Sequence, residues 1–347
     1  MPHDPSRGRT TPRPPHSAPS RTGTARPGTA RTGPAHAAPA RAGRRPEQPL
    51  GPERPLGPDD PHHVGDYSLL GRLGDGTRDS VYLGRAQDGE LVTVKLLPDG
   101  TEGPRARTGL AREADAALQV AGRNTARVLD ADMTGDHPYI VSEYVEGPSL
   151  HDTVDDHGPL GGPQMRKVAL RTAGALAAIH RAGIVHRAFN PGSVLLAPDG
   201  AKVVDFGAAG TTHAAPTGPP AYMAPEQIED EPVGPPADVF AWGATMVFAA
   251  TGHPPFGTGS ATAVMRRVTS RRPDLGDMEG PLRDLTARCL DKNPAARPTA
   301  RQLVRALREG HGPAPQPRPT RIPGYRWRMM LALVGVVALG FALGVLI

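Results

Sequence analysis

Hydrophobic and polar positions change their spacing several times along this chain. Short alternating apolar runs separated by Gly- and Asp-rich turns predict strands in the first part of the folded region. Leu110, Ala114 and Leu118 share one face of a predicted helix, and helical spacing dominates the later part. The expected strands are Tyr67–Gly71, Ser80–Arg85, Glu90–Leu97 and Tyr139–Val145, and the long helical or apolar runs are Thr108–Val120, Pro163–Ala182 and Val239–Ala250. This order predicts an α+β fold with a small β-rich lobe followed by a larger helical lobe.

Residues 1–64 have no apolar periodicity. They are a run of Pro, Arg, Gly, Thr and Ala, which buries too little surface to offset the entropy lost on ordering the chain. We therefore predict a disordered arm at 1–64 and a folded domain at 65–310. The arginines of the arm could bind anionic lipid or nucleic acid, but a solvated linker is the interpretation we adopt.

An uninterrupted apolar stretch closes the chain. Met329–Ile347 contains no charged side chain in 19 residues. As a helix it would span about 28 Å, close to the hydrocarbon thickness of a bilayer. Trp327 and its flanking arginines suit the cytoplasmic interface. The sequence predicts a Pro-rich juxtamembrane linker at 311–326 and a transmembrane helix at 327–347, in a single-pass protein of the cell membrane whose domain lies in the cytoplasm.

The same stretch contains a small-residue pair. Gly340 and Gly344 are spaced as in helices that dimerise within membranes, so the sequence allows a homodimer. No apolar signal-peptide region precedes the folded domain, so we expect no cleaved leader.

Charge is distributed unevenly along the chain. The net charge is +5, but residues 1–45 carry nine Arg and one Asp, and residues 310–347 carry four Arg and no acid. Residues 46–309 hold 27 basic and 34 acidic side chains, a net charge of −7. A nucleic-acid-binding domain is therefore not indicated. The single cysteine, Cys289, excludes an intramolecular disulfide.

Short motifs follow one another in a specific order. They are Leu-Gly-Asp-Gly at 73–76, Lys95 on a strand, Glu113 on a helix, Ser-Glu-Tyr-Val at 142–145, His-Arg at 186–187, Asp-Phe-Gly at 205–207, Ala-Pro-Glu at 224–226, Asp238 and Arg297. Each motif is common, but their order and spacing together are specific. On these residues the chain resembles the eukaryotic-type serine/threonine protein kinases of bacteria, particularly the membrane-bound kinases of actinobacteria. The resemblance covers about residues 67–309 and implies a bilobal protein kinase fold.

The resemblance implies a role for each matching residue. In the family, a Gly-rich loop covers the ATP phosphates, a strand Lys holds them and pairs with a helix Glu, and an Asp holds Mg²⁺. By resemblance, the residues that would bind ATP are Gly74, Gly76, Val81, Lys95, Glu113, Glu143 and Val145. Asp205 would hold Mg²⁺. Two roles are structural: Arg297 would pair with Glu226, and Asp238 would brace the catalytic loop.

The catalytic loop departs from the family pattern. Where the family has His-Arg-Asp-Leu-Lys-Pro-x-Asn, residues 186–193 read His-Arg-Ala-Phe-Asn-Pro-Gly-Ser. Ala188 replaces the Asp that accepts the proton of the substrate hydroxyl, and Asn190 replaces the Lys that neutralises the transferring phosphoryl group. Ser193 replaces the Asn that holds a second Mg²⁺, and a hydroxyl is a poorer ligand. Losing a positioned base costs about 10²–10⁴ in rate, so we expect no efficient catalysis.

Two other departures concern ATP and substrate. Asp79 stands at the third Gly of the Gly-rich loop, where its bulk and negative charge lower the expected affinity for nucleotide. Pro219 replaces a Thr that helps to orient a protein substrate. The loop threonines Thr211, Thr212 and Thr217 are either targets of another kinase or ordinary loop residues.

Three functions are open from the sequence. The first is a pseudokinase, an ATP- and Mg²⁺-binding module at the membrane that regulates or scaffolds other kinases or envelope proteins. The second is a slow ATP-dependent serine/threonine kinase, and the third is a transferase that moves another part of ATP, such as AMP. Lys95, Glu113 and Asp205 could also be structural residues that bind no nucleotide. The discriminating observation is whether Asp205 is needed for any covalent product.

Overall fold

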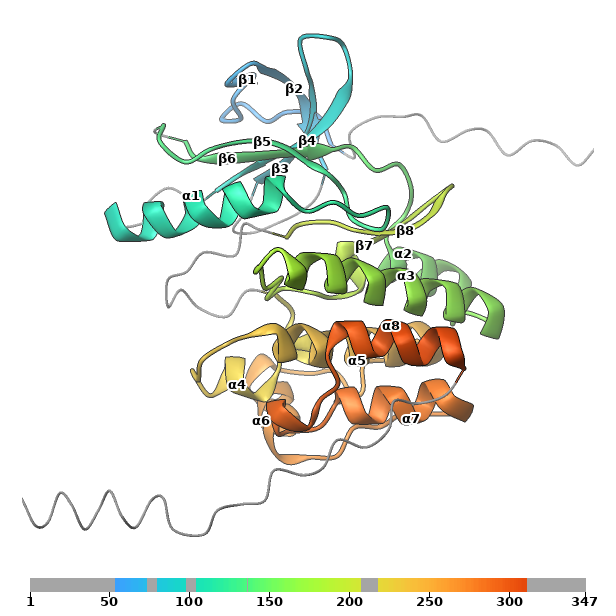
Figure 1. Ribbon diagram of the computed structural model, residues 1–347. Helices are drawn as coiled ribbons and strands as arrows, with labels where there is room; N and C mark the ends of the chain where they lie inside the picture. Colours follow the sequence, from blue (N-terminus) through green and yellow to red (C-terminus); the bar gives the residue numbers. More distant parts are fainter. Residues whose placement is uncertain (1–53, 74–79, 98–103, 136, 207–217, 311–347) are drawn as a thin grey trace, which may run out of the picture. The chain divides into compact units, whose positions relative to one another are not determined.

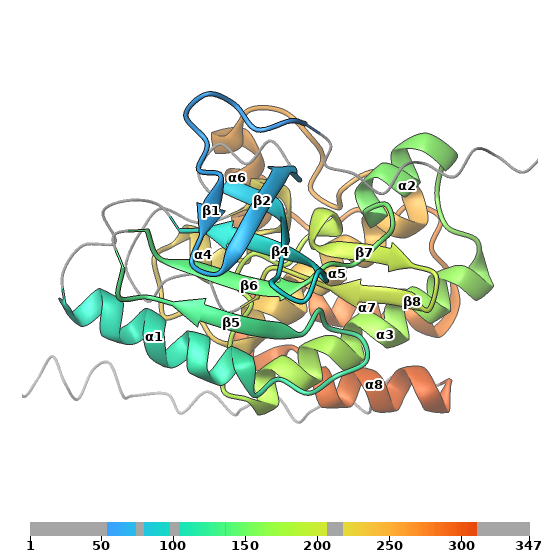
Figure 2. The same ribbon diagram turned by 90° about the horizontal axis from the view of Figure 1, so that it is seen from above.

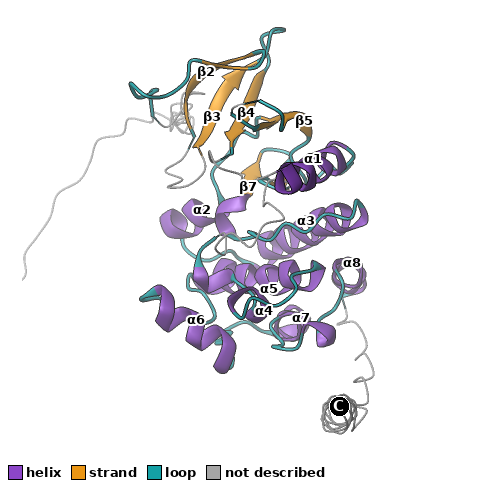
Figure 3. Cartoon of the chain, turned by 90° about the vertical axis from the view of Figure 1, so that its left-hand side faces the viewer, coloured by secondary structure: helices purple, strands orange, loops and turns teal. Residues whose placement is uncertain are grey.

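A six-stranded antiparallel sheet precedes a group of helices in this protein. The computed structural model describes residues 54–73, 80–97, 104–135, 137–206 and 218–310. Figure 1 and Figure 3 show the sheet above the helical part. The sheet strands are β1 (His63–Val64), β2 (Tyr67–Arg72), β3 (Ser80–Arg85), β4 (Leu91–Leu96), β5 (Val128–Asp132) and β6 (Tyr139–Glu143), in the order β1-β2-β3-β4-β6-β5. The expected strands are therefore present, with ends that differ by a residue or two.

The alternation of β4 orients the charged residue of this strand. Val92 and Val94 are buried in an apolar cluster with Tyr82. Because successive side chains of a strand point to opposite faces, Thr93 and Lys95 share the other face. That face carries the candidate site described below.

Helix α1 (Pro104–Leu118) lies alongside β5, as Figure 1 and Figure 2 both show. It begins earlier than expected, at a proline, which suits the first turn of a helix. Leu110 and Ala114 are buried as predicted, but Leu118 is 38% exposed. Ala117, which is fully buried, follows them on the packed face instead. The prediction that Leu118 continues this face is wrong, because the helix is rotated so that the i, i+4, i+7 positions pack.

The segment from Arg54 to Val64 is folded against the sheet. Arg54 and Arg72 exchange two backbone hydrogen bonds of 3.3 and 2.9 Å, and β1 pairs with β2. The buried carboxylate of Asp60 accepts hydrogen bonds from Arg72 Nε (2.8 Å) and from the Tyr82 hydroxyl (2.7 Å). The predicted boundary of the disordered arm at residue 64 is therefore wrong, because strand pairing and buried polar contacts hold this Pro-containing stretch. Residues 1–53 lie outside the described part of the chain.

The helical part is built around one almost wholly buried helix. Its helices are α2 (Leu150–His157), α3 (Gly162–Arg181), α4 (Pro225–Ile228), α5 (Pro235–Thr251), α6 (Ala261–Ser270), α7 (Gly280–Cys289) and α8 (Ala300–Glu309). A hairpin of β7 (Val194–Ala197) and β8 (Gly200–Val203) joins this part to the sheet side, and short 3-10 turns span Pro191–Ser193, Pro220–Tyr222 and Pro294–Ala296. Trp242 on α5 is fully buried and donates from Nε1 to the Thr172 hydroxyl on α3 at 2.9 Å. The expected bilobal α+β arrangement is confirmed.

In the described residues, no helix has both the length and the apolar character that crossing a bilayer requires. The linker expected at 311–326 and the membrane helix expected at 327–347 lie outside the described residues. The membrane anchor stays a prediction.

Candidate functional site

Asp238 organises the loop that follows α3. It comes from the first turn of α5 and is fully buried. Its carboxylate accepts the backbone N–H groups of His186 and Arg187, both at 2.8 Å, and lies 2.7 Å from Nε2 of His180. Arg187 has a φ of 61°, a left-handed conformation that costs a non-glycine residue energy. The buried carboxylate holds this strained turn in place, as expected for the residue that braces the catalytic loop.

His186 and Phe189 are packing residues of this loop. The imidazole of His186 is fully buried, and burial lowers its pKa, so it is neutral. Its Nε2 lies 3.0 Å from the carbonyl oxygen of Val204, which fixes the proton on Nε2 as the donor. Phe189 is 1% exposed and meets the imidazole edge to face at 5.5 Å. Neither side chain is available for proton transfer to a substrate.

The residues at the three altered catalytic positions, Ala188, Asn190 and Ser193, are joined by hydrogen bonds within one turn. Asn190 donates from Nδ2 to the carbonyl oxygen of Ala188 (2.8 Å) and accepts from the Gly192 N–H (2.7 Å). Ser193 donates from Oγ to the Asn190 carbonyl oxygen (2.9 Å) and accepts from the Asn190 N–H (3.1 Å). Both polar side chains therefore cap the 3-10 turn at Pro191–Ser193.

The segment between the Asp-Phe-Gly and Ala-Pro-Glu motifs is called the activation segment, and its first described residue after Phe206 is Gly218. Gly218 lies next to Ala188. A methyl group placed on Gly218 would be 4.0 Å from the Cβ of Ala188. Pro219 follows it and precedes the turn at Pro220–Tyr222. The hydroxyl-bearing Thr211, Thr212 and Thr217 lie outside the described residues. A methyl group, without acid–base chemistry, thus stands where this segment meets the catalytic loop.

Lys95 and Asp205 both line one small cavity. Its lining comes from β4, the region around β5 and β6, and the start of the Asp-Phe-Gly motif. The lining residues are Thr93, Lys95, Ala126, Val128, Ile140, Ser142, Asp205 and Phe206. Phe206 is 3% exposed, whereas Asp205 is exposed and has a φ of 63°. The structure thus brings a cation and a carboxylate to one place, with the charge pattern that would suit a phosphate and its magnesium ion.

The connection between the two lobes carries an ion pair that the sequence did not indicate. Nζ of Lys202, on β8, lies 2.8 Å from a carboxylate oxygen of Glu143 at the end of β6. The N–H of Glu143 donates to the carbonyl oxygen of Arg127 (2.8 Å). Val145 is buried and Val81 is half-buried. The adenine contacts expected at this connection stay predictions, as do those of Gly74 and Gly76, which lie with Asp79 outside the described residues.

Glu113 has a different partner from the one expected. Its two carboxylate oxygens are each 3.2 Å from Nη1 of Arg187. Among the described residues, Glu113 therefore pairs with Arg187 and not with Lys95, the partner that the resemblance implies. The sequence placed the carboxylate on the correct helix, but the position of α1 decides which cation it reaches.

The structural ion pair of the helical part forms as expected. Arg297 binds Glu226 through two parallel contacts, Nη1 to Oε1 at 2.6 Å and Nη2 to Oε2 at 2.8 Å. Arg297 also donates to the carbonyl oxygens of Pro236, Asp291 and Lys292. The pair ties the Ala-Pro-Glu motif to the chain before α8.

Comparison with known proteins gives one family. The protein kinase domain family matches residues 67–307. The chain is 41% identical over 260 residues to the probable serine/threonine-protein kinase PkwA of Thermomonospora curvata, across 73% of this chain and 35% of that protein. It is 38% identical over 257 residues to the serine/threonine-protein kinase AfsK of Streptomyces coelicolor, across 72% of this chain and 32% of that protein.

A third relative covers less of the chain. The serine/threonine-protein kinase PknL of Mycobacterium tuberculosis is 32% identical over 210 residues, across 57% of this chain and 52% of that protein. The chain spans about a third of the length of the Thermomonospora and Streptomyces relatives.

The family match and the relatives point to the same family as the placement of Asp238, Asp205 and Lys95 in the structure. The chain belongs to the protein kinase domain family, among the bacterial serine/threonine kinases of eukaryotic type.

Proposed function

We propose that this protein is a catalytically impaired kinase-domain protein, a pseudokinase, that binds ATP and acts in signalling as a regulator or scaffold. Its partners would be other kinases or envelope proteins, and its place would be the cytoplasmic face of the cell membrane. The proposal rests on the kinase-family domain, the altered catalytic loop, and the apolar stretch at 329–347.

The observation that supports impaired catalysis is that the altered residues of the catalytic loop hydrogen-bond to one another. Ala188 has no group that accepts a proton. The hydrogen-bonding groups of Asn190 and Ser193 are used within the turn at Pro191–Ser193. A positioned general base contributes about 10²–10⁴ to a rate, and stabilisation of charge in the transition state contributes about another 10²–10³. With both removed, phosphoryl transfer at kinase rates is not expected.

The chain retains a partial fit to nucleotide. Lys95 would hold phosphate oxygens, and Asp205 would supply one carboxylate to Mg²⁺, because the two side chains line the same cavity. Ser193 fits the second metal position poorly, since its side chain is buried and its hydroxyl already donates to and accepts from Asn190. Bound Mg²⁺ would neutralise phosphate charge. Such binding could bias α1 between an arrangement in which Glu113 holds Arg187 and one in which it holds Lys95.

A slow kinase is the second candidate. The observation that favours it is the shared cavity of Lys95 and Asp205, because phosphoryl transfer depends mainly on positioning and charge. A transferase that moves AMP from ATP is the third candidate, and a gain of mass equal to AMP would reveal it.

Intact mass spectrometry after incubation with ATP and Mg²⁺ or Mn²⁺ tests the function. The full chain, its Asp205→Asn variant and a matched Asp199→Asn variant, which changes an exposed carboxylate in the β7–β8 turn, would be compared with a general kinase substrate present. An unchanged mass in all three supports the pseudokinase. A gain of phosphate or AMP that Asp205→Asn abolishes and Asp199→Asn preserves would replace it with an active transferase.

Nucleotide binding and membrane attachment have separate tests. ATP with Mg²⁺ should raise the melting temperature of the wild type and of Asp199→Asn, and less that of Asp205→Asn. Deleting 329–347 should move the protein from the membrane to the soluble fraction of a cell lysate. A full-length protein that is already soluble would contradict the anchor, and an absent thermal shift would contradict ATP binding.

A further inference from the structure

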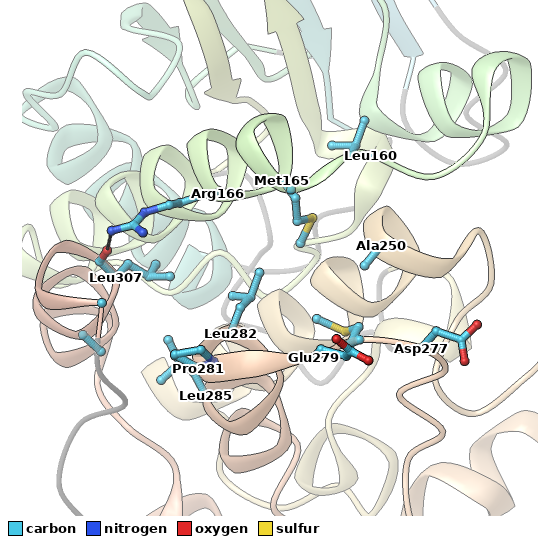
Figure 4. A pocket seen from close by; sticks show the side chains of 14 residues that line it. Leu160, Met165, Arg166, Ala250, Asp277, Glu279, Pro281, Leu282, Leu285 and Leu307 are labelled. Atoms are coloured by element: carbon cyan, nitrogen blue, oxygen red, sulfur yellow. Dashed lines mark hydrogen bonds between the residues drawn. The ribbon is translucent and has the colours of Figure 1, made fainter.

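A large pocket opens in the helical part, away from the catalytic loop. Its volume is about 410 Å³, within the range of sites that take drug-sized ligands, about 300–1,000 Å³. Helices α3, α5, α7 and α8 contribute to it, as Figure 4 shows. Its apolar lining includes Leu160, Met165, Ala250, Leu282, Leu285 and Leu307. Met165, Leu285 and Leu307 are buried, so the pocket reaches into the core.

The edge of this pocket is acidic on one side. Asp277 and Glu279 line it just before α7, and both residues are exposed. Within the described ranges neither carboxylate has an ion-pair partner. Arg166, at the other end of the labelled residues in Figure 4, donates from Nη2 to the carbonyl oxygen of Leu307 (3.1 Å). The guanidinium is thus engaged with the end of α8, while the two carboxylates stay available to a cationic occupant.

The last described residue of the chain lines this pocket. It is Gly310, whose φ of 68° ends α8 in a left-handed turn. The segment that follows carries only basic charge. Between Arg318 and Arg326 the chain reads Arg-Pro-Thr-Arg-Ile-Pro-Gly-Tyr-Arg, so Ile322 and Tyr325 alternate with cations. Its composition is complementary to an apolar pocket with an acidic edge.

We propose that the segment Arg318–Arg326 of this chain docks in the pocket between α3, α5, α7 and α8. Ile322 and Tyr325 pack against the apolar lining formed by Met165, Leu282 and Leu307, and the arginines pair with Asp277 and Glu279.

The length of the connection allows this docking. Ile322 is twelve residues after Gly310, and that stretch spans at most about 40 Å when extended. The Pro-Gly step at 323–324 favours a turn. Covalent linkage gives a segment on so short a connection an effective concentration of order millimolar. A contact too weak to hold a separate peptide can therefore persist within the chain.

The consequence concerns the orientation of the domain. The docked segment directly precedes Trp327 and the apolar stretch Met329–Ile347. Docking would hold the α7 side of the helical part close to that stretch and leave the opposite, sheet-bearing side turned away. The inference requires neither nucleotide binding nor catalysis, so its failure is distinguishable from failure of the proposed function.

Disulfide trapping in the full chain tests the docking. The variant Glu279→Cys with Ile322→Cys places one thiol at the pocket edge and one on the segment. The control, Asp284→Cys with Ile322→Cys, uses an exposed position on α7, five residues after Glu279, that does not line the pocket. The native Cys289 is fully buried, and burial raises its pKa, so it does not compete. A disulfide forms only where the two Cα atoms approach within about 7 Å.

We expect the intramolecular disulfide to form about tenfold faster with Glu279→Cys than with the control. Adding Arg318→Gln, Arg321→Gln and Arg326→Gln, or raising the salt to about 1 M, should remove most of that advantage. Equal rates at Glu279→Cys and Asp284→Cys would overturn the proposal. A disulfide that joins two chains in preference to one would overturn the assignment of the segment to its own pocket.

Discussion

Nη1 of Arg187 lies 3.2 Å from each carboxylate oxygen of Glu113, which joins the catalytic loop to α1 across 74 residues of sequence. The side chain of Glu113 is 9% exposed and that of Arg187 is 26% exposed. Water therefore screens this pair less than a surface pair. Since one carboxylate cannot hold Arg187 and approach Lys95 equally, the position of α1 decides which of the two cations Glu113 reaches.

The Arg187–Glu113 pair should show a measurable coupling energy. Glu113→Gln, Arg187→Gln and the double variant form a cycle that isolates the pairwise contribution to the free energy of unfolding. We expect about 0.5–3 kcal/mol, because both side chains are at least half-buried. Chemical denaturation measures it. The exposed pair Arg305–Glu309 on α8 serves as the control and should give about 0.2–1 kcal/mol or less; a coupling for Arg187–Glu113 no greater than this would contradict the idea that the pair holds α1.

Breaking the Arg297–Glu226 pair should cost much more. The two side chains are 0% and 5% exposed, so removing either leaves a charge buried without its partner. We expect a loss of about 3–5 kcal/mol in the free energy of unfolding. Arg297→Met should cost more than Glu226→Gln, because it also leaves the carbonyl oxygens of Asp291, Lys292 and Pro236 without this donor. Denaturant titration gives both values, and the opposite ranking would show that the carbonyl contacts contribute little.

Asp60 should make stability depend on pH in the acidic range. The guanidinium of Arg72, together with the Tyr82 hydroxyl and the Gly57 N–H, holds the pKa of this carboxyl well below its usual value of 3.8. The unfolded state therefore binds more protons than the folded state below that value. The stabilisation from the charged Asp60 is fully present at neutral pH and is lost as the pH falls below about 4 toward the folded pKa.

Asp60→Asn is the variant that reveals this dependence. It should lower the free energy of unfolding at pH 7 by about 1.5–3 kcal/mol, the usual contribution of hydrogen bonds to a charged group. The difference from the wild type should stay constant down to about pH 5 and shrink below about pH 4. Asp59→Asn, at the exposed neighbouring position, should change stability little at any pH. A difference that is independent of pH down to about pH 2 would contradict the role of the charge.

The sequence predicted the two lobes and the structural contacts of Asp238 and Arg297 because those features have local signals. The apolar pattern at 90–97 placed Lys95 on a strand, and the motif at 186–193 placed the catalytic loop at its expected length. Asp238 and Arg297 have the contacts that family resemblance assigns to them. These roles depend on short-range pattern and on motif order, both of which are read directly from residues.

The features that sequence could not predict depend on long-range placement. Asp60 meets Tyr82 across 22 residues, and nothing in a Pro-rich stretch without apolar period indicates that contact. Glu113 reaches Arg187 because of where α1 lies. Lys202 meets Glu143 because the β7–β8 hairpin passes the end of β6. In each case a charged side chain has several candidate partners in the sequence, and only tertiary packing selects one.

The catalytic loop gives the most demanding prediction. Ala188→Asp alone should restore little phosphoryl transfer, because Asn190 and Ser193 would still hold the turn closed through their hydrogen bonds to the backbone of residues 188–193. The triple variant Ala188→Asp, Asn190→Lys, Ser193→Asn returns the base, the cation and the metal ligand together. We expect it to transfer phosphate about 10²–10⁴ times faster than the wild type, and to lose about 1 kcal/mol of stability with the Asn190 cap.

The rate of the triple variant is measured as transfer of the γ-phosphate of ATP to a general protein substrate. Adding Asp205→Asn to it should abolish the gain, since that carboxylate would hold the metal, whereas Asp199→Asn should leave the gain intact. If the triple variant and the wild type are equally inactive while both bind ATP with Mg²⁺, the three loop positions are not what limits catalysis. The limitation would then lie in Glu113, whose carboxylate binds Arg187 where the family has it bind the strand Lys. Adding Arg187→Gln to the triple variant should then free Glu113 to approach Lys95 and raise the rate.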